Sequence, residues 1–152
     1  MTGVQTCALP ISNCFLAVGI VLAAIWSDRT SARRVLLLGA LGTIAVGLLF
    51  APGLASGSSL LVFATLSLAL FTMGFVYGPL GGWLAALYPV SVRYSGVSVA
   101  FNAGGILGGA VTPLLAKQLV NAGLGSYFGL LLVGAGLLSL IGVALAKPAR
   151  EA

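Results

Sequence analysis

The sequence predicts an all-α, polytopic membrane protein with about five transmembrane helices. Of its 152 residues, 60% are hydrophobic and only 6% are charged, whereas an ordinary soluble domain is roughly a quarter charged. The mean hydropathy of +1.18 points the same way. A soluble fold needs enough polar groups to cover its outside, and seven basic with two acidic residues cannot do that. We therefore expect lipid to surround most of this chain.

Residues 1–11, MTGVQTCALPI, are set apart from this prediction. They resemble the translation of a common sequencing-library adapter read from a GTG start codon. We interpret them as an adapter-derived artefact and exclude them, as one excludes a fusion scar. A signal peptide is the competing interpretation, but it requires a basic first region and an apolar core of about 7 to 15 residues. The segment has neither before Pro10, so we expect the sequence of the gene itself to begin near Ser12.

Five apolar segments are candidates for crossing a hydrocarbon core of roughly 30 Å, which takes about 20 residues. The third is longer than one crossing requires, and a kink is expected at Pro79, with a second at Pro113 in the fourth segment. The connections are short and rich in turn-forming residues, so adjacent helices are expected to be antiparallel neighbours. The expected spans are approximately residues 12–27, 35–51, 58–87, 97–119 and 127–146.

The basic residues predict the orientation of these helices. If the helices alternate in direction, six of the seven positive charges gather at one end and only Lys117 lies near the other. Basic loops stay on the cytoplasmic side of a membrane. We therefore expect a multi-pass protein of the bacterial inner membrane with its C-terminus in the cytoplasm. The six residues are Arg29, Arg33, Arg34, Arg93, Lys147 and Arg150.

The same composition argues against an enzyme. The chain has no histidine, and its only acidic residues are Asp28 and Glu151. This leaves no carboxylate pair for acid–base chemistry and no ligand cluster for a metal. The basic residues are dispersed between apolar runs rather than gathered in a patch for nucleic acid. We expect no catalytic residue, no metal, no cofactor and no nucleic-acid partner.

Glycines recur at four-residue spacing on two of the expected helices. Helices in lipid associate by close packing of small residues, because hiding apolar faces from lipid gains little. Two interpretations stay open for these stripes: static helix packing, or a surface on which one helical bundle moves against another. The expected packing residues are Gly74, Gly78 and Gly82 on the third segment and Gly104, Gly105, Gly108 and Gly109 on the fourth.

Two stretches of sequence resemble the major facilitator superfamily of transporters. Residues 19–34, GIVLAAIWSDRTSARR, are similar to the loop motif between helices eight and nine of that superfamily, with one extra residue and Thr30-Ser31-Ala32 in place of its glycine turn. Residues 77–116 resemble the helix ten to helix eleven region of its metabolite:proton symporter branch, which includes proline/betaine, shikimate and α-ketoglutarate carriers. Ala86 stands where that branch often has glutamate. The matching residues are Asp28, Arg29, Arg33 and Arg34 in the first stretch and Tyr77, Gly78, Pro79, Pro89, Arg93, Tyr94, Gly96, Ser98, Asn102, Gly108, Gly109 and Pro113 in the second.

The resemblance implies helices eight to twelve of a twelve-helix carrier, forming part of its C-terminal six-helix bundle. Such a carrier performs proton-coupled symport of a small organic acid or osmolyte by alternating access, with the substrate near the bilayer midplane. The missing N-terminal half would be a partner, and the isolated chain would be incomplete. No acidic residue lies inside any expected span, so a proton-carrying carboxylate would lie elsewhere.

Individual residues also receive expected roles. Among the few polar residues inside the expected spans, the candidates for substrate binding are Asn102, Tyr77 and Thr72. The amide of Asn102 is the hardest of these to satisfy within its own helix, so it is expected to face a water-filled cavity or substrate, or else to form an interhelical hydrogen bond. A cytoplasmic gate would brace helix ends in one conformational state, and the alternative is that these charges only set topology. Its expected members are Asp28, Arg29, Arg33, Arg34 and Arg93.

A different class of function also remains open from the residues alone. The chain could be an integral membrane subunit that transports nothing and assembles through its GxxxG helix faces.

Overall fold

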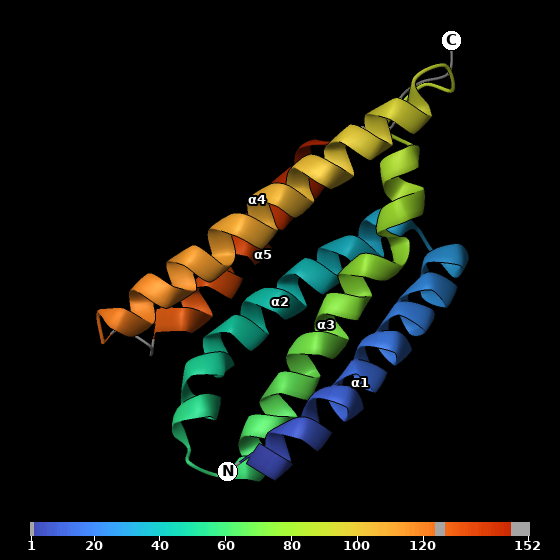
Figure 1. Cartoon of the computed structure of the whole chain (residues 1–152). Coiled ribbons are helices and arrows are strands. Elements are labelled where there is room, and N and C mark those ends of the chain that lie inside the picture. The colour runs from blue at the N-terminus through green and yellow to red at the C-terminus, as the bar shows by residue number, and fades with distance from the viewer. Residues whose placement is uncertain (1, 124–126, 147–152) are drawn as a thin grey trace.

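In a computed structural model, the described residues form five α-helices, which confirms the all-helical prediction (Figure 1). The structure describes residues 2–123 and 127–146, and these contain no strand. The helices are α1 (Thr2–Arg29), α2 (Ala32–Ala55), α3 (Ser59–Ala85), α4 (Arg93–Asn121) and α5 (Phe128–Leu145).

Three of these helices are long and apolar enough to cross a membrane. They contain the stretches Ala32–Gly53, Ser59–Ala85 and Arg93–Leu119, while the apolar stretch of α5, Gly129–Leu145, is shorter. Over their described residues, α1 and α5 do not meet this criterion of length and hydropathy. α1 begins at Thr2, so most of the segment set apart in the sequence is helical.

The turns between helices are built from local sequence. Ser31 caps α2 from an extended conformation, and its hydroxyl accepts a hydrogen bond from the Arg34 backbone N–H at 3.3 Å. Gly57, between α2 and α3, has a φ of +66°, which favours glycine. These short turns reverse the chain, so consecutive helices run in opposite directions (Figure 1).

Glycines bring helix backbones into contact in the packed part of the fold. α3 lies along α1, where a Cβ on Gly74 would overlap the Leu16 carbonyl oxygen and one on Gly78 would lie 2.7 Å from that of Ile20. α2 packs between α3 and α5, and a Cβ on Gly47 would lie 2.9 Å from the Gly129 carbonyl oxygen. Small residues thus permit the close backbone approach that holds helices together in lipid.

α4 lies apart from this packed group. Its residues 101–115 are all exposed, and a Cβ on any of Gly104, Gly105, Gly108 or Gly109 would meet no described atom within 4 Å. The same holds for Gly82 of α3. The close packing expected through these five glycines is therefore not made by the described residues. The physical reason is that α1, α2, α3 and α5 pack on one another and leave no helix against this side of α4.

The two internal prolines differ in their effect. α3 runs through Pro79 without a break, but its last part bends away from the direction of the rest (Figure 1). A proline removes one backbone hydrogen bond and crowds the preceding turn, which explains the bend. α4 also continues through Pro113, and Figure 1 shows no comparable bend there.

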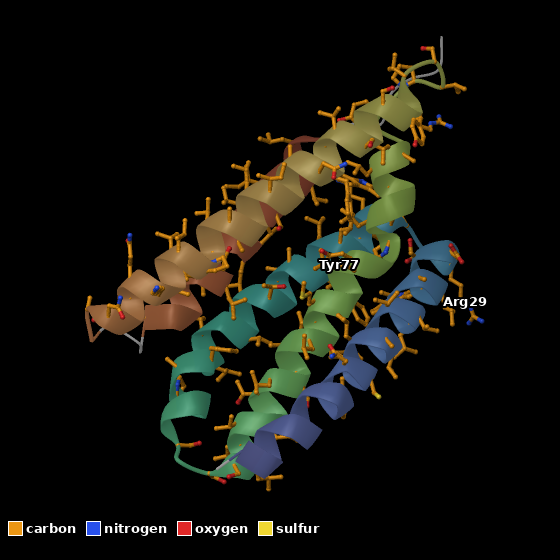
Figure 2. All side chains as sticks on the ribbon, in the orientation of Figure 1. Arg29 and Tyr77 are labelled. Carbon is orange, nitrogen blue, oxygen red and sulfur yellow. The ribbon has the colours of Figure 1, made fainter. Side chains whose placement is uncertain are left out.

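One end of the molecule gathers most of the described positive charge. The α1–α2 turn, the connection from α3 to α4 and the end of α5 lie at that end, and Arg29 is labelled there in Figure 2. Arg33, Arg34 and Arg93 begin helices at the same end, whereas Lys117 lies near the opposite end of α4. Lys147 and Arg150 lie outside the described residues.

Candidate functional site

A groove of about 720 Å³ separates the C-terminal half of α3 from the middle of α4. Its volume lies within the range of about 300 to 1,000 Å³ typical of small-molecule sites. We call it the α3–α4 groove. Four of its α4 residues are glycines, and a Cβ on any of them would meet no described atom within 4 Å. Its lining residues are Met73, Tyr77, Leu80 and Leu84 from α3 and Ala100, Phe101, Gly104, Gly105, Gly108, Gly109, Thr112 and Pro113 from α4.

A second hollow of about 400 Å³ lies at the start of α4. It shares Phe101 with the groove, and we call it the Arg93 hollow. Positions 94, 98, 101, 105, 108 and 112 are spaced by three or four residues, so they lie on one face of α4. The two hollows are therefore consecutive stretches of the same helix face. The lining residues of the second are Arg93, Tyr94, Val97, Ser98, Phe101 and Asn102.

Tyr77 and Asn102 line different hollows. Tyr77, labelled in Figure 2, is 47% exposed and borders the α3–α4 groove. Asn102 borders the Arg93 hollow, and its amide nitrogen donates to the Ser98 carbonyl oxygen at 2.8 Å. One amide hydrogen of Asn102 is thus satisfied within its own helix, contrary to the expectation that this would be difficult.

Thr72 is not part of either hollow. It is only 8% exposed, and its hydroxyl donates to the Leu68 carbonyl oxygen at 2.8 Å. Its methyl group faces α2, 2.9 Å from where a Cβ on Gly42 would lie. Thr72 precedes Tyr77 by five residues, which turns it about 140° away around a helix of 3.6 residues per turn. Thr72 therefore faces α2, on another side of α3 from Tyr77.

Three hydroxyls along the hollows differ from those of Thr43, Thr65 and Thr72. Thr43 and Thr65 donate to carbonyl oxygens one turn earlier, at 2.9 and 2.8 Å, as Thr72 does. The side-chain hydroxyls of Tyr77, Ser98 and Thr112 make no hydrogen bond to any described residue. A hydroxyl in an apolar environment costs free energy unless it forms a hydrogen bond. These three hydroxyls can therefore form hydrogen bonds with a bound molecule.

At the basic end, an arginine joins two helices by donating a hydrogen bond to a backbone carbonyl rather than to a carboxylate. Arg33 at the start of α2 donates from Nη2 to the Ala144 carbonyl oxygen near the end of α5, at 2.9 Å. A cation at the negative end of a helix dipole is favourable. Asp28 forms no ion pair with any described residue, and its side chain and that of Arg29 are exposed at the end of α1. Among the expected members of the gate, Arg33 makes this contact with the end of another helix.

Arg93 is held by the loop that precedes α4. Its Nε donates to the Tyr88 carbonyl oxygen at 3.3 Å. The ring of Tyr88 also lies over Gly96, where a Cβ would stand 2.6 Å from its Cε1. This arrangement fixes the guanidinium beside the Arg93 hollow, because the loop packs back onto the first turn of α4.

Several residues that border the hollows were not named as site candidates from the sequence, among them Ser98, Phe101 and Thr112. A usable signal was present for two of them. Ser98 lies one turn before Asn102, and Thr112 lies one turn after Gly108, so both share the face of α4 that carries the glycines. Phe101 carries no such signal, since an aromatic residue in an apolar helix is ordinary.

Within the part of the chain that the structure describes, no three His, Cys, Asp or Glu residues come together as metal ligands. Long apolar helices with backbone contacts at glycines are typical of a polytopic membrane protein, and the open groove offers space and a few hydroxyls to a small molecule.

Comparison with known proteins identifies the family. Residues 4–148 match the family described as "Sugar (and other) transporter", and the chain belongs to this family of the major facilitator superfamily. No solved structure matches the chain.

The relatives are bacterial transport proteins. The chain is 44% identical over 103 residues to "Inner membrane metabolite transport protein YhjE" of Escherichia coli, covering 67% of the chain and 23% of the relative. A "Putative metabolite transport protein" of Haemophilus influenzae is 30% identical over 117 residues, covering 77% of the chain and 26% of that protein. A second protein of that name and organism is 32% identical over 139 residues, covering 91% and 31%. The matched part of the chain thus spans only 23% to 31% of the length of these relatives.

Proposed function

We propose that the chain forms part of the C-terminal six-helix bundle of a secondary transporter that moves a small organic acid or osmolyte with protons by alternating access. The α3–α4 groove is the observation that carries this proposal. It lies midway along α4, where a membrane carrier binds its substrate, and it opens on the side of α4 that no described helix covers. Tyr77 is the proposed substrate contact in the groove, and Asn102 the contact beside it.

The orientation and the gate belong to the same proposal. The end that holds Arg29, Arg33, Arg34 and Arg93 faces the cytoplasm, because basic loops stay on that side. The contact from Arg33 to the end of α5 is proposed to form in one conformational state and to break in the other. The C-terminus is then cytoplasmic.

The titratable side chain that carries the proton is proposed to lie outside the spans of this chain. None of the three candidate spans contains Asp or Glu. A carrier usually holds its proton on a titratable side chain within the membrane. We therefore place the proton-carrying carboxylate in the remainder of the transporter, which lies beyond the segment that matches the relatives here.

Two measurements test the proposal. A long sequencing read upstream of the Ser12 codon is expected to continue into about seven further apolar segments, with a second Asp-Arg-rich loop. The complete protein in proteoliposomes is then expected to accumulate a radiolabelled organic acid or betaine under an inward proton gradient, and to stop when an ionophore dissipates it. Uptake that is the same with and without the proton gradient would refute proton coupling. If the complete protein takes up none of the organic acids or betaines tested, the proposal that it is a transporter of such compounds is refuted.

The alternative is an integral membrane subunit that transports nothing. The exposed face of α4 favours it, because Gly104, Gly105, Gly108 and Gly109 leave space for another helix. A genuine start codon at or just before Ser12 would support this subunit and remove the second half that the transporter needs. The isolated 152-residue chain is expected to support no uptake in proteoliposomes, and uptake by it would contradict the view that it is incomplete.

A further inference from the structure

We propose that the outer face of α2 binds an anionic phospholipid, with the lipid phosphate at Arg34 and an acyl chain along the leucines that follow. This surface is separate from the α3–α4 groove. The inference does not depend on transport, because it requires only that α2 stands in a bilayer. We call the surface the Arg34 stripe, and its residues are Arg34, Leu38, Leu41, Ala45 and Leu48.

The Arg34 stripe is one continuous exposed face of α2. Its residues follow one another at spacings of four, three, four and three positions, which places them on one side of a helix. All five are exposed, and the exposed fractions of Leu38, Leu41 and Leu48 are 47%, 52% and 62%. Because α2 is long and apolar enough to cross a membrane, this face meets the hydrocarbon of the bilayer.

The placement of the small residues of α2 indicates that lipid, rather than another helix, covers this face. A Cβ on Gly39 would lie 2.9 Å from the Cγ2 of Val76 in α3, so this glycine lies on a packed side. Gly47 likewise meets the Gly129 backbone of α5. Helix contacts in membranes are rich in small residues, whereas leucine is as apolar as a lipid tail. α2 thus directs glycines at its neighbours and leucines outward.

Arg34 stands at the head of the stripe with a guanidinium that can bind an anion. Ser31 accepts a hydrogen bond from the backbone N–H of Arg34, but the Arg34 side chain makes no hydrogen bond to any described residue. The neighbouring Arg33 differs, because it donates to the Ala144 carbonyl oxygen. An arginine at the edge of an apolar surface keeps its stem on that surface and its guanidinium at the headgroups. A guanidinium can donate two parallel hydrogen bonds to one phosphate.

The charge around Arg34 favours an anionic lipid over a zwitterionic one. Arg29 lies across the α1–α2 turn, where its exposed side chain is directed away from the helices (Figure 2). It makes no hydrogen bond to any described residue. Residues 28–34 contain three arginines against the single carboxylate of Asp28, and the start of α2 adds the positive end of its dipole. Basic residues at a bilayer surface attract anionic lipids.

The dimensions fit one lipid in one leaflet. A helix rises about 1.5 Å per residue, so Leu41 lies about 10 Å along the axis from Arg34, and Leu48 about 21 Å. Half of a hydrocarbon core of about 30 Å is about 15 Å. A lipid whose phosphate contacts Arg34 therefore passes Leu38 and Leu41, whereas Leu48 lies in the opposite leaflet.

Photo-crosslinking tests which lipid lies on the stripe. The photoreactive amino acid p-benzoylphenylalanine replaces Leu41 in the complete protein, in nanodiscs with equal amounts of phosphatidylglycerol and phosphatidylcholine. The two lipids have the same acyl chains and differ in net charge, and mass spectrometry gives the ratio in which they are attached. We expect phosphatidylglycerol to exceed phosphatidylcholine about fivefold, the effect of one basic residue at an anionic surface. The same probe in place of Leu48, in the opposite leaflet, is expected to give equal amounts.

The variants assign this preference to Arg34. Arg34→Gln is expected to bring the ratio at position 41 to within about twofold of one without lowering the total amount of lipid attached. Arg34→Lys is expected to keep most of the preference, because it keeps the charge. Lys117→Gln, which removes one positive charge at the opposite end of the molecule, is the matched control and is expected to change nothing. Glycerol 3-phosphate carries the phosphate without the chains, and an excess of it is expected not to displace the lipid.

Each other result overturns the proposal. Equal amounts of the two lipids in the wild type, or a phosphatidylglycerol excess at both probe positions, would mean that the stripe selects no lipid. A preference that survives Arg34→Gln would place the anion elsewhere, and a fall of both lipids together would mean that Arg34 only holds α2 in place. Displacement by glycerol 3-phosphate would mean a site for free phosphate, and crosslinks to protein would mean that another helix covers the stripe. Because the measurement needs no uptake, a protein that selects phosphatidylglycerol through Arg34 but transports nothing refutes the transporter and leaves the lipid site intact.

Discussion

Gly74 is the position at which the packing of α1 on α3 can be tested most directly. A Cβ there would overlap the Leu16 carbonyl oxygen and would lie 2.9 Å from the Ile20 nitrogen, where ordinary contact starts at 3.4 Å. Both neighbours are backbone atoms of α1, so they cannot rotate away. The Gly74→Ala change must therefore push α1 outward by at least about half an ångström, and overpacking of this kind costs about 1 to 3 kcal/mol.

Gly82 on the same helix supplies the control. A Cβ there meets nothing within 4 Å, so Gly82→Ala introduces no clash. Both substitutions gain the same helix propensity, about 1 kcal/mol for alanine over glycine. The difference between the two variants therefore isolates the clash, and we expect Gly74→Ala to be less stable than Gly82→Ala by about 1 to 3 kcal/mol.

The assay uses a reporter that lies at this interface. Trp26 of α1 packs edge-on against Phe75 of α3, with ring centroids 5.9 Å apart. In a Trp83→Phe background, the fluorescence of Trp26 follows the separation of α1 from α3 as SDS is added to mixed micelles. If Gly74→Ala and Gly82→Ala unfold at the same SDS fraction, the backbone contact at Gly74 does not exist and the reasoning fails.

Three further predictions concern the basic end and the groove. Arg33→Gln removes the contact to α5 and is expected to lower the free energy of unfolding by about 1 kcal/mol in the same SDS titration. The control is Arg34→Gln, which should have a smaller effect because the side chain of Arg34 makes no hydrogen bond to a described residue. Equal effects of the two variants would contradict the role of Arg33 in holding α5. In the complete transporter, Tyr77→Phe is expected to raise the KM for uptake about fivefold, as expected for one lost hydrogen bond. Thr72→Val should leave KM within about twofold, and the reverse order would place the substrate on the α2 side of α3. Gly108→Leu should abolish uptake without lowering stability, because its Cβ would stand in open space and the rest of the side chain would enter the groove. A loss of stability instead would show that another helix packs there.

Much of the fold follows from the sequence because membrane helices are locally determined. Each expected span overlaps one observed helix, since apolar runs of this length must satisfy their backbone hydrogen bonds internally. The boundaries shifted where polar residues continue a helix beyond its apolar part, as at Arg93, which begins α4. The close approach at Gly74 and Gly78 also follows from their spacing.

The candidate site was less accessible to prediction. Tyr77 and Asn102 were singled out as polar residues within apolar helices, and each borders a hollow. Thr72 met the same criterion but faces α2, because nothing in its own segment distinguishes one side of α3 from another. A helix that is apolar all round carries little amphipathic signal for its buried face.

By itself, the sequence determined that the chain is helical, that it is built for lipid and that its positive charge gathers at one end. These properties depend on composition and on order along the chain. Only the tertiary structure decided that Gly74 meets a neighbouring backbone while Gly108 faces a groove, and that Phe101 joins the groove to the Arg93 hollow. Contacts between helices depend on how each helix is rotated and placed against the next. In lipid no hydrophobic force sets that rotation, so shape complementarity between particular side chains decides it.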